Sequence, residues 1–354
     1  MPTGLFDAKE RFGVEQYRMD AAANLVRECV EREEIPGAVL LIGNRGKTLC
    51  HEAWGWAQLI PEKLPMTKDT LFDIASLTKI VGTWTGIAML LQEGRLSLTD
   101  KLCDMLHHQK MHPSLREITL WNLLTHTAGL IPFRHPSEAL ETRKERIDEL
   151  FMIPAEKGRG AQAVYSDLSF IYLGEILAEA MGEKQNFVVD EICNALGMYD
   201  TCYLPSERAY CAATEVREGE TIRARVHDTT AHMLGGVAGH AGLFSTAADL
   251  GAFCAAILPP TQHPAFREEW LRKSYENQTA HLGENRALGW IAYVERPEGN
   301  IVGHTGFTGT SIWMDTASGD YVILLTNRVH PTRENRAHLK LRREVFKVLF
   351  DAEL

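Results

Sequence analysis

Residues 72–86 read FDIASLTKIVGTWTG, and the segment within them that decides the fold is Ser76-Leu77-Thr78-Lys79. Side chains three residues apart are neighbours on one face of a helix, so we expect the Lys79 amine within hydrogen-bond reach of the Ser76 hydroxyl. A serine hydroxyl next to a basic group is an arrangement for nucleophilic catalysis. The alternative is a helix-capping serine beside a solvated lysine, and four residues alone do not decide between the two.

The residues that follow the pair predict a buried helix. Apolar side chains recur at helical spacing from Ile80 to Leu91, and Gly94 is a typical residue just past the end of a helix. The helix would begin at Ser76, where the positive end of the helix dipole favours negative charge that develops on a reacting oxygen.

Two later segments carry further polar groups in a recognisable order. Residues 163–177, AVYSDLSFIYLGEIL, contain Tyr165-Ser166-Asp167, and residues 301–315, IVGHTGFTGTSIWMD, contain His304-Thr305-Gly306. Together with Ser-x-x-Lys, this order resembles the β-lactamase-related family of serine hydrolases, which includes penicillin-binding proteins, class C β-lactamases and family VIII esterases. The resemblance extends from about Ile35 to the C-terminal helix.

The expected fold is of the α/β (α+β) class. Residues 38–42 and 48–56 are expected to form two strands joined by a hairpin at Asn44-Arg45-Gly46. Four more strands are expected between residues 288 and 326. The resemblance implies an antiparallel sheet flanked by N- and C-terminal helices, with an inserted, mainly helical lobe. We expect a single domain over residues 10–350, made of an α/β lobe (about 10–75 and 254–350) and a helical lobe (about 76–253), with the site between them.

The resemblance implies that Ser76 attacks a carbonyl carbon and forms an acyl-enzyme. Lys79 and Tyr165 are the candidates for the base. A lysine acts as a base at neutral pH only if its pKa is lowered, and a tyrosine needs positive charge nearby to lose its proton. The base in acylation stays open, and the resemblance favours Tyr165 for deacylation and for protonation of the leaving group. The expected oxyanion donors are the backbone N–H groups of Ser76 and, by resemblance, Phe307.

Two positions depart from the family pattern. Asp167 stands where an amide side chain is usual, so a carboxylate would face Lys79 and hold it protonated; alternatively, a local shift of the loop makes Asp167 a surface residue. His304 replaces the usual lysine before Thr305 and Gly306. A histidine that is neutral at pH 7 offers less fixed charge for a substrate carboxylate, which favours an esterase, aminopeptidase or amidase over an efficient β-lactamase.

The remaining histidines do not predict a metal site, and no cofactor is expected. Positions 107, 108 and 112 lie in a polar connection without cysteines or paired carboxylates. His126 is interpreted as a structural residue after a buried helix. His227 and His240 flank a glycine-rich segment and either line the pocket or hold that segment by hydrogen bonds.

Composition agrees with one substantial enzyme. The chain has 354 residues, 45% of them hydrophobic, and a net charge of −10 without a basic run, which argues against nucleic acid or an anionic membrane as partner. Its seven cysteines are scattered, as in proteins with reduced thiols. Because the first residues lack the apolar stretch of a signal peptide, we expect a cytoplasmic protein. The oligomeric state stays open.

The sequence therefore predicts a serine hydrolase that cleaves an ester or amide bond of a small molecule or cell-wall fragment. Carboxylesterase and peptidoglycan-fragment amidase or peptidase compete, with weak β-lactamase activity at most. Residues 235–247 and 324–336 resemble a branch that contains cell-wall amidases. One alternative is a penicillin-binding receptor or sensor that deacylates slowly. Another is an interaction protein on an inactive scaffold, which would be expected to have lost Ser76, Lys79 or Tyr165.

Overall fold

The computed structural model describes residues 14–107, 110–206, 210–261 and 263–354. A seven-stranded antiparallel sheet runs through it in the order β3-β2-β1-β12-β11-β10-β9. The expected hairpin at Arg45-Gly46 is confirmed, because both residues have positive φ (46° and 82°) and join two adjacent strands. The strands are β1 (Gly37–Asn44), β2 (Lys47–Gln58), β3 (Leu64–Pro65), β9 (Ile291–Val294), β10 (Ile301–Thr305), β11 (Ser311–Asp315) and β12 (Asp320–Thr326).

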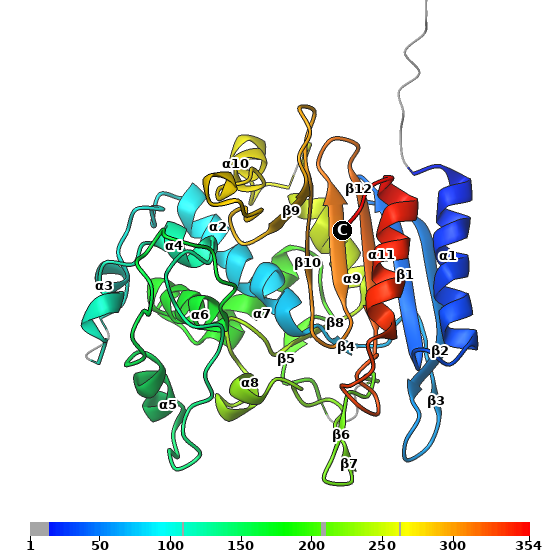
Figure 1. Ribbon diagram of the computed structural model, residues 1–354, viewed down its shortest axis with the longest axis horizontal. Helices are drawn as coiled ribbons and strands as arrows, with labels where there is room; N and C mark the ends of the chain where they lie inside the picture. The colour runs from blue at the N-terminus through cyan, green and yellow to red at the C-terminus, as the bar shows by residue number, and fades with distance from the viewer. Residues whose placement is uncertain (1–13, 108–109, 207–209, 262) are drawn as a thin grey trace, which may run out of the picture.

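The first and last helices cover one face of this sheet. Helix α1 (Gln16–Glu31) and helix α11 (Ala337–Phe350) lie side by side along the strands (Figure 1). Helix α1 buries Met19, Ala22, Val26 and Cys29, which recur at helical spacing. Beneath α11, the buried ring of Trp313 packs 5.6 Å from that of Phe346. The apolar faces of α1 and α11 thus pack on the same face of the sheet.

The other face carries α9 (Ala247–Ile257), which packs on β1 and β12. The remaining helices gather to one side of the sheet, next to β9 and β10 (Figure 1). They are α2 (Thr85–Gln92), α3 (Leu102–Met105), α4 (Leu120–Leu124), α5 (Arg143–Leu150), α6 (Asp167–Met181), α7 (Gln185–Ala195), α8 (Thr229–Met233) and α10 (Glu268–Ser274). None of the described helices is long and apolar enough to cross a membrane.

Short strands connect these helices. A three-stranded sheet is formed by β4 (Phe72–Asp73), β8 (Leu243–Ser245) and β5 (Cys202–Tyr203), and β6 (Val216–Arg217) pairs with β7 (Glu220–Thr221). The predicted fold class is confirmed: terminal helices flank a large antiparallel sheet, and a mainly helical part is inserted. The exact limits of the two lobes stay a prediction, and the predicted domain start at residue 10 lies outside the described residues.

The helix predicted from Ser76 onwards exists but does not begin as a regular α-helix. A 3₁₀ turn (Ala75–Leu77) leads into a π-helical segment (Lys79–Trp84) and only then into α2. Gly94 follows with φ 71°, as predicted. Wide helical turns of this kind are frequent at functional sites. Here the turn carries the buried Lys79, whose amine contacts groups far away in sequence, and helical periodicity cannot anticipate such contacts.

Candidate active site

A buried carboxyl group positions the turn that presents Ser76. Ala75, the residue before it, has φ 47°, a backbone conformation that residues with a Cβ atom rarely adopt. The Asp73 carboxylate accepts a hydrogen bond from the Ala75 N–H (2.9 Å) and another from the His227 N–H (2.7 Å). Burial raises the pKa of Asp73 to about 6. The sequence analysis missed Asp73; its only signal was an acidic residue in the apolar approach to Ser76.

Most of the predicted site residues meet at one cavity of about 640 Å³. Its lining includes Ser76, Tyr165, His304, Thr305, Gly306 and Phe307, which come from three segments separated by up to 231 positions (307 − 76). The other two predicted residues do not line the cavity. Lys79 is fully buried, and the Asp167 side chain is 24% exposed. The structure thus brings together the segments of Ser76, Tyr165 and His304. Lys79 links the first two of these segments, because its amine contacts both Ser76 and Asp167.

Three oxygen atoms surround the Lys79 amine. Its Nζ donates to Ser76 Oγ at 3.0 Å and to the His240 carbonyl at 3.1 Å, and it forms an ion pair with Asp167 Oδ1 at 2.8 Å. Burial alone would lower the pKa of Lys79, but the Asp167 carboxylate and the Tyr165 side chain outweigh burial and raise it above its ordinary value. Lys79 is therefore protonated at neutral pH. Asp167 faces it, and does not lie on a shifted surface loop.

Two imidazole rings flank Tyr165. The Lys79 Nζ lies 5.0 Å from the centre of the Tyr165 ring, and the rings of His126 and His304 lie 4.7 Å and 5.9 Å from it. His126 Nδ1 accepts a hydrogen bond from the Ser166 N–H at 3.1 Å, which ties the Tyr165 segment at the start of α6 to the residues that follow α4. Burial lowers the pKa of His126 well below its usual value. His126 is structural, as interpreted from the sequence, and it also packs directly on Tyr165.

His304 occupies β10 as a neutral, buried imidazole. Burial, with the positive charge of Lys79 as a second cause, lowers its pKa to about 3. Its Nδ1 lies 3.0 Å from the Thr305 carbonyl, so Nδ1 carries the proton and Nε2 has a lone pair. This Nε2 is buried without a hydrogen-bond partner among the described residues. The expectation that His304 supplies less fixed charge than a lysine agrees with this environment.

The turn after Gly306 lies tightly against the chain that leads to Ser76. A Cβ atom on Gly306 would come within 2.6 Å of the Ile74 carbonyl, so glycine permits this close approach. The Thr310 hydroxyl donates to the same carbonyl at 3.1 Å, and the Thr308 hydroxyl donates to the Asp73 carbonyl at 2.8 Å. Phe307 is held in this turn because the Arg328 Nε donates to its carbonyl at 3.0 Å. These contacts bring the backbone of Phe307 and that of the Ser76 turn to one wall of the cavity.

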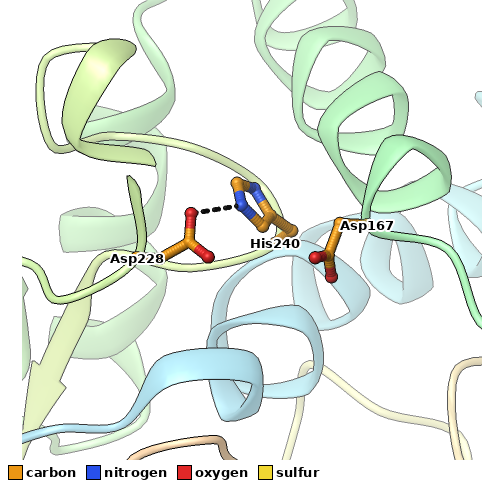
Figure 2. Close-up of side chains that lie close together, drawn as sticks. All are labelled: Asp167, Asp228 and His240. Atoms are coloured by element: carbon orange, nitrogen blue, oxygen red, sulfur yellow. Dashed lines mark hydrogen bonds and ion pairs between the residues drawn. The ribbon is translucent and has the colours of Figure 1, made fainter. Parts of the chain in front are cut away.

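Two carboxylates and one imidazole lie close together (Figure 2), and two of these three residues, Asp167 and His240, contact the Lys79 amine. Asp167, Asp228 and His240 offer ligand atoms within 4.8 Å of one another, the spacing of a possible cation site. His240 Nε2 lies 2.9 Å from Asp228 Oδ1, which also accepts the Ala231 N–H at the start of α8. Burial would raise the pKa of Asp228, but His240 and Lys79 bring it below its usual range. The Lys79 ammonium already provides the positive charge that these carboxylates need.

The two histidines of the glycine-rich segment therefore hold it in place. The carbonyl of His240 accepts from Lys79 and its ring pairs with Asp228. His227 donates its backbone N–H to Asp73, and its ring stacks at 5.6 Å on Phe307. Neither ring is part of the cavity lining. Of the alternatives left open for these residues, the hydrogen-bonding one describes the structure.

The polar histidine stretch lies away from the cavity. His107 pairs with Glu179 at 3.3 Å, and His112 caps a short 3₁₀ turn. His108 lies outside the described residues. All seven cysteines are free in the structure.

Arginines that no sequence motif singled out complete the cavity. Besides the predicted residues, its lining includes Arg286, Arg328, Arg333, Glu334, Arg336 and Arg342. Three of these arginines lie in residues 324–336, which were noted for their resemblance to cell-wall amidases but not assigned to the site. Nothing in the local pattern indicated that they would line the same cavity as Ser76, because the segments meet only in the folded chain.

Comparison with known proteins places the chain in a family. It is 27% identical to the N-acetylmuramyl-L-alanine amidase of Bacillus subtilis (strain 168), over 86% of this chain and 80% of the relative. It is 26% identical to a protein of Escherichia coli (strain K12) named for D-alanyl-D-alanine carboxypeptidase activity, over 83% of this chain and 79% of the relative.

Solved structures share the fold. EstCE1, described as a hydrolase with promiscuous acyltransferase activity, superposes with a TM-score of 0.75 at 19% identity, covering 94% of this chain and 99% of that one. A class C β-lactamase from Rhodobacter sphaeroides superposes with a TM-score of 0.72 at 22% identity, covering 92% and 99%. The family model described as Beta-lactamase matches residues 22–347. The chain therefore belongs to the β-lactamase family, and with it to the hydrolases of that fold.

Proposed function

We propose that this protein is a serine hydrolase that cleaves an ester or amide bond through an acyl-enzyme on Ser76. The observation that carries the proposal is the hydrogen bond of 3.0 Å from the buried Lys79 amine to Ser76 Oγ, at a cavity that Tyr165 also lines. A serine hydroxyl, a fixed cation and a proton-transfer group converge there, as nucleophilic catalysis requires. An inactive scaffold would not need to bury a lysine to reach that hydroxyl.

Tyr165 is the proposed base in acylation. Lys79 is protonated and donates to Ser76 Oγ, so it has no lone pair to accept the serine proton. The Ser76 O–H bond therefore breaks toward a deprotonated Tyr165, whose negative charge the neighbouring ammonium favours. At the same time the Oγ–carbon bond forms. The bond from the carbonyl carbon to the leaving group then breaks, and Tyr165 passes the proton to the leaving group. In deacylation Tyr165 takes a proton from the attacking water, the bond from the acyl carbon to Ser76 Oγ breaks, and the proton passes to Ser76 Oγ.

Backbone groups are proposed to bind the oxygen of the tetrahedral intermediate. The donors are the N–H groups of Ser76 and Phe307, supported by the contacts that hold the two turns against one wall. Fixed donors of this kind stabilise charge only as it develops, which lowers the barrier of the chemical step.

For the substrate, we propose a small ester or a peptidoglycan fragment, cleaved as carboxylesterase, amidase or peptidase. The relatives named as amidase and carboxypeptidase support a cell-wall fragment, and the fold shared with EstCE1 is compatible with ester cleavage. Weak β-lactamase activity at most stays our prediction. The neutral His304 favours this prediction, whereas the arginines of the same cavity supply positive charge and act in the opposite sense.

The function is tested with a panel of 4-nitrophenyl acyl esters, nitrocefin and purified muropeptides, followed by intact-protein mass spectrometry. We expect turnover of an ester or a muropeptide and a transient adduct on Ser76. An adduct that persists for hours without product release would favour the slowly deacylating receptor instead. Wild-type protein that neither turns over nor is acylated by any of these compounds would refute the hydrolase proposal.

A further inference from the structure

Backbone groups of the glycine-rich segment contact the helical turns that carry Lys79. The Gly239 carbonyl accepts a hydrogen bond from the Thr83 hydroxyl at 2.8 Å, and the His240 carbonyl accepts one from the Lys79 amine at 3.1 Å. A Cβ atom on Gly239 would collide with the Phe170 carbonyl of α6, so glycine permits the close packing of this segment. The position of the His240 carbonyl therefore depends on how the segment is held.

The ring of His240 is tied to a residue at the other end of the segment. His240 Nε2 lies 2.9 Å from Asp228 Oδ1, and Figure 2 shows the ring turned toward this carboxylate. Asp228 is fixed in turn, because it caps α8 by accepting the Ala231 N–H at 2.8 Å. The His240 side chain is only 1% exposed, so a ring without this contact would be a buried polar group without its partner. The contact thus closes the segment into a loop.

The His240 carbonyl is one of three acceptors around the Lys79 ammonium. An ammonium has three N–H donors, and the other two acceptors are Ser76 Oγ at 3.0 Å and Asp167 Oδ1 at 2.8 Å. All three donors of this fully buried group thus have partners. If the carbonyl moved away, a buried N–H would be unpaired or the amine would turn from Ser76 Oγ. The placement of the amine beside the proposed nucleophile therefore depends on the loop.

Asp228 also places negative charge near this ammonium. A carboxylate oxygen of Asp228 lies within 4.8 Å of one of Asp167, which pairs with Lys79. Lys79 is among the groups that lower the pKa of Asp228, and the same attraction favours the protonated form of Lys79. The other described titratable groups whose charges act on Lys79, or on which its charge acts, are Asp167, Tyr165, His126 and His304. The two histidines among them are neutral, so Asp228 adds to the charge of Asp167.

We propose that Asp228 and His240 are positioning residues of the active site: they hold the carbonyl of residue 240 against the Lys79 ammonium, and the charge of Asp228 helps to keep that ammonium protonated. Neither residue lines the cavity, so both act through Lys79 and not by touching the substrate. The inference rests on the proposed acyl-enzyme function. It assigns a role in that function to a side-chain pair at some distance from the reacting bond.

The test measures kcat/KM for 4-nitrophenyl acetate in Asp228→Ala, His240→Ala and the double variant. His240→Ala removes the ring but keeps the backbone carbonyl. Asp228→Asn is the conservative variant, because asparagine also caps helices and keeps an acceptor oxygen but lacks the charge. The matched control is His232→Ala, which removes an exposed histidine of α8 outside the cavity lining. Thermal unfolding of each variant verifies that it is folded.

We expect each alanine variant to lower kcat/KM by about 10- to 100-fold, the effect of a small displacement of reacting groups. The double variant should lose no more than the weaker single variant, because both substitutions remove one contact. Asp228→Asn should lose less activity than Asp228→Ala, and the basic limb of its pH–rate profile should move to lower pH by about half a unit. His232→Ala should behave as the wild type.

Four results would overturn the proposal. They are near-normal activity of either alanine variant, losses that multiply in the double variant, an equal loss in His232→Ala, and a pH–rate profile of Asp228→Asn that coincides with the wild type. If an alanine variant does not fold, the pH–rate profile of Asp228→Asn decides.

A measurement without turnover distinguishes failure of this inference from failure of the hydrolase proposal. Acetylation of Lys79 by acetic anhydride is followed by peptide mass spectrometry, with the exposed Lys47 as internal reference. Only a neutral amine reacts, so Asp228→Ala and His240→Ala should accelerate acetylation of Lys79 by about tenfold, the effect of one pKa unit, and leave that of Lys47 unchanged. Acceleration in a protein that hydrolyses no ester would support the positioning role without catalysis. A Lys79 rate that both variants leave unchanged would refute it.

Discussion

The Asp167 carboxylate lies 2.8 Å from the Lys79 ammonium, and the same ammonium lies 3.0 Å from Ser76 Oγ. Where an amide is usual in the family, this chain has a carboxylate that faces the lysine. The pair keeps the pKa of Lys79 above its ordinary value despite complete burial, because the attraction between the two charges outweighs the loss of hydration. It supports the division of roles that we propose, in which Lys79 is a fixed cation and Tyr165 transfers protons.

Asp167→Asn should move the basic limb of the pH–rate profile to lower pH. The substitution removes the negative charge that stabilises protonated Lys79, so Lys79 loses its proton, and the site its cation, at lower pH. The measurement is kcat/KM against pH for one activated ester. The control is Asp104→Asn, an exposed residue outside the cavity, which should leave the profile unmoved. A profile for Asp167→Asn that coincides with the wild type would mean that Lys79 does not set the basic limb.

Tyr165→Phe should lower kcat by roughly 10²–10⁴-fold, the usual contribution of general acid–base catalysis. Phenylalanine keeps the ring that packs on His126 and loses only the hydroxyl, so the thermal unfolding temperature should change little. Tyr199→Phe provides the matched control, because the Tyr199 side chain is 78% exposed and away from the cavity. Near-normal activity of Tyr165→Phe would exclude Tyr165 as the proton-transfer group.

Ser76→Ala should abolish covalent labelling by a fluorophosphonate or a labelled penicillin. The side chain contributes the attacking oxygen and little packing, so the variant should fold and unfold at a temperature close to that of the wild type. Intact-protein mass spectrometry after labelling makes the comparison, with Ser97→Ala, an exposed serine outside the cavity, as the control that keeps the adduct. An adduct of the same mass on Ser76→Ala would refute the nucleophile assignment.

The protein should lose stability as the pH falls from 7.5 to 5. Burial lowers the pKa of His227 to about 4 and that of His304 to about 3, so both stay neutral in the folded state while they gain protons in the unfolded chain. Stability is therefore complete above pH 6.5 and decreases below it, by about 2 kcal/mol per such histidine at pH 5. Asp73 acts in the opposite sense, because its raised pKa favours the protonated folded state over the same range.

His304→Asn tests this assignment. The free energy of unfolding, measured by chemical denaturation at pH 7.5 and pH 5, should depend on pH less in the variant than in the wild type, by about 2 kcal/mol. His281→Asn removes an exposed histidine and should keep the wild-type difference. If both variants keep the full pH dependence, His304 is not held neutral in the folded protein.

Local spacing predicted much of the fold and several of the residues that line the cavity. The three-residue separation of Ser76 and Lys79, the turn at Arg45-Gly46 and the glycine that follows α2 are properties of short segments, and the structure contains all of them. Periodicity is reliable over such distances because backbone geometry alone decides which side chains share a face. The irregular start of the Ser76 helix was not predicted, since it depends on what Lys79 contacts.

Only the tertiary structure decided which groups control the charges at the site. Asp167 and the His240 carbonyl reach Lys79 from 88 and 161 positions away, and Arg286 and Arg342 line the same cavity as His304 from 18 and 38 positions away. The sequence by itself determined which chemical groups are available: a hydroxyl, an amine, a phenol and an imidazole. Their pKa values depend on distances and burial, because electrostatic energy varies with separation and hydration. Both are set only when the sheet, α11 and the inserted helices pack together.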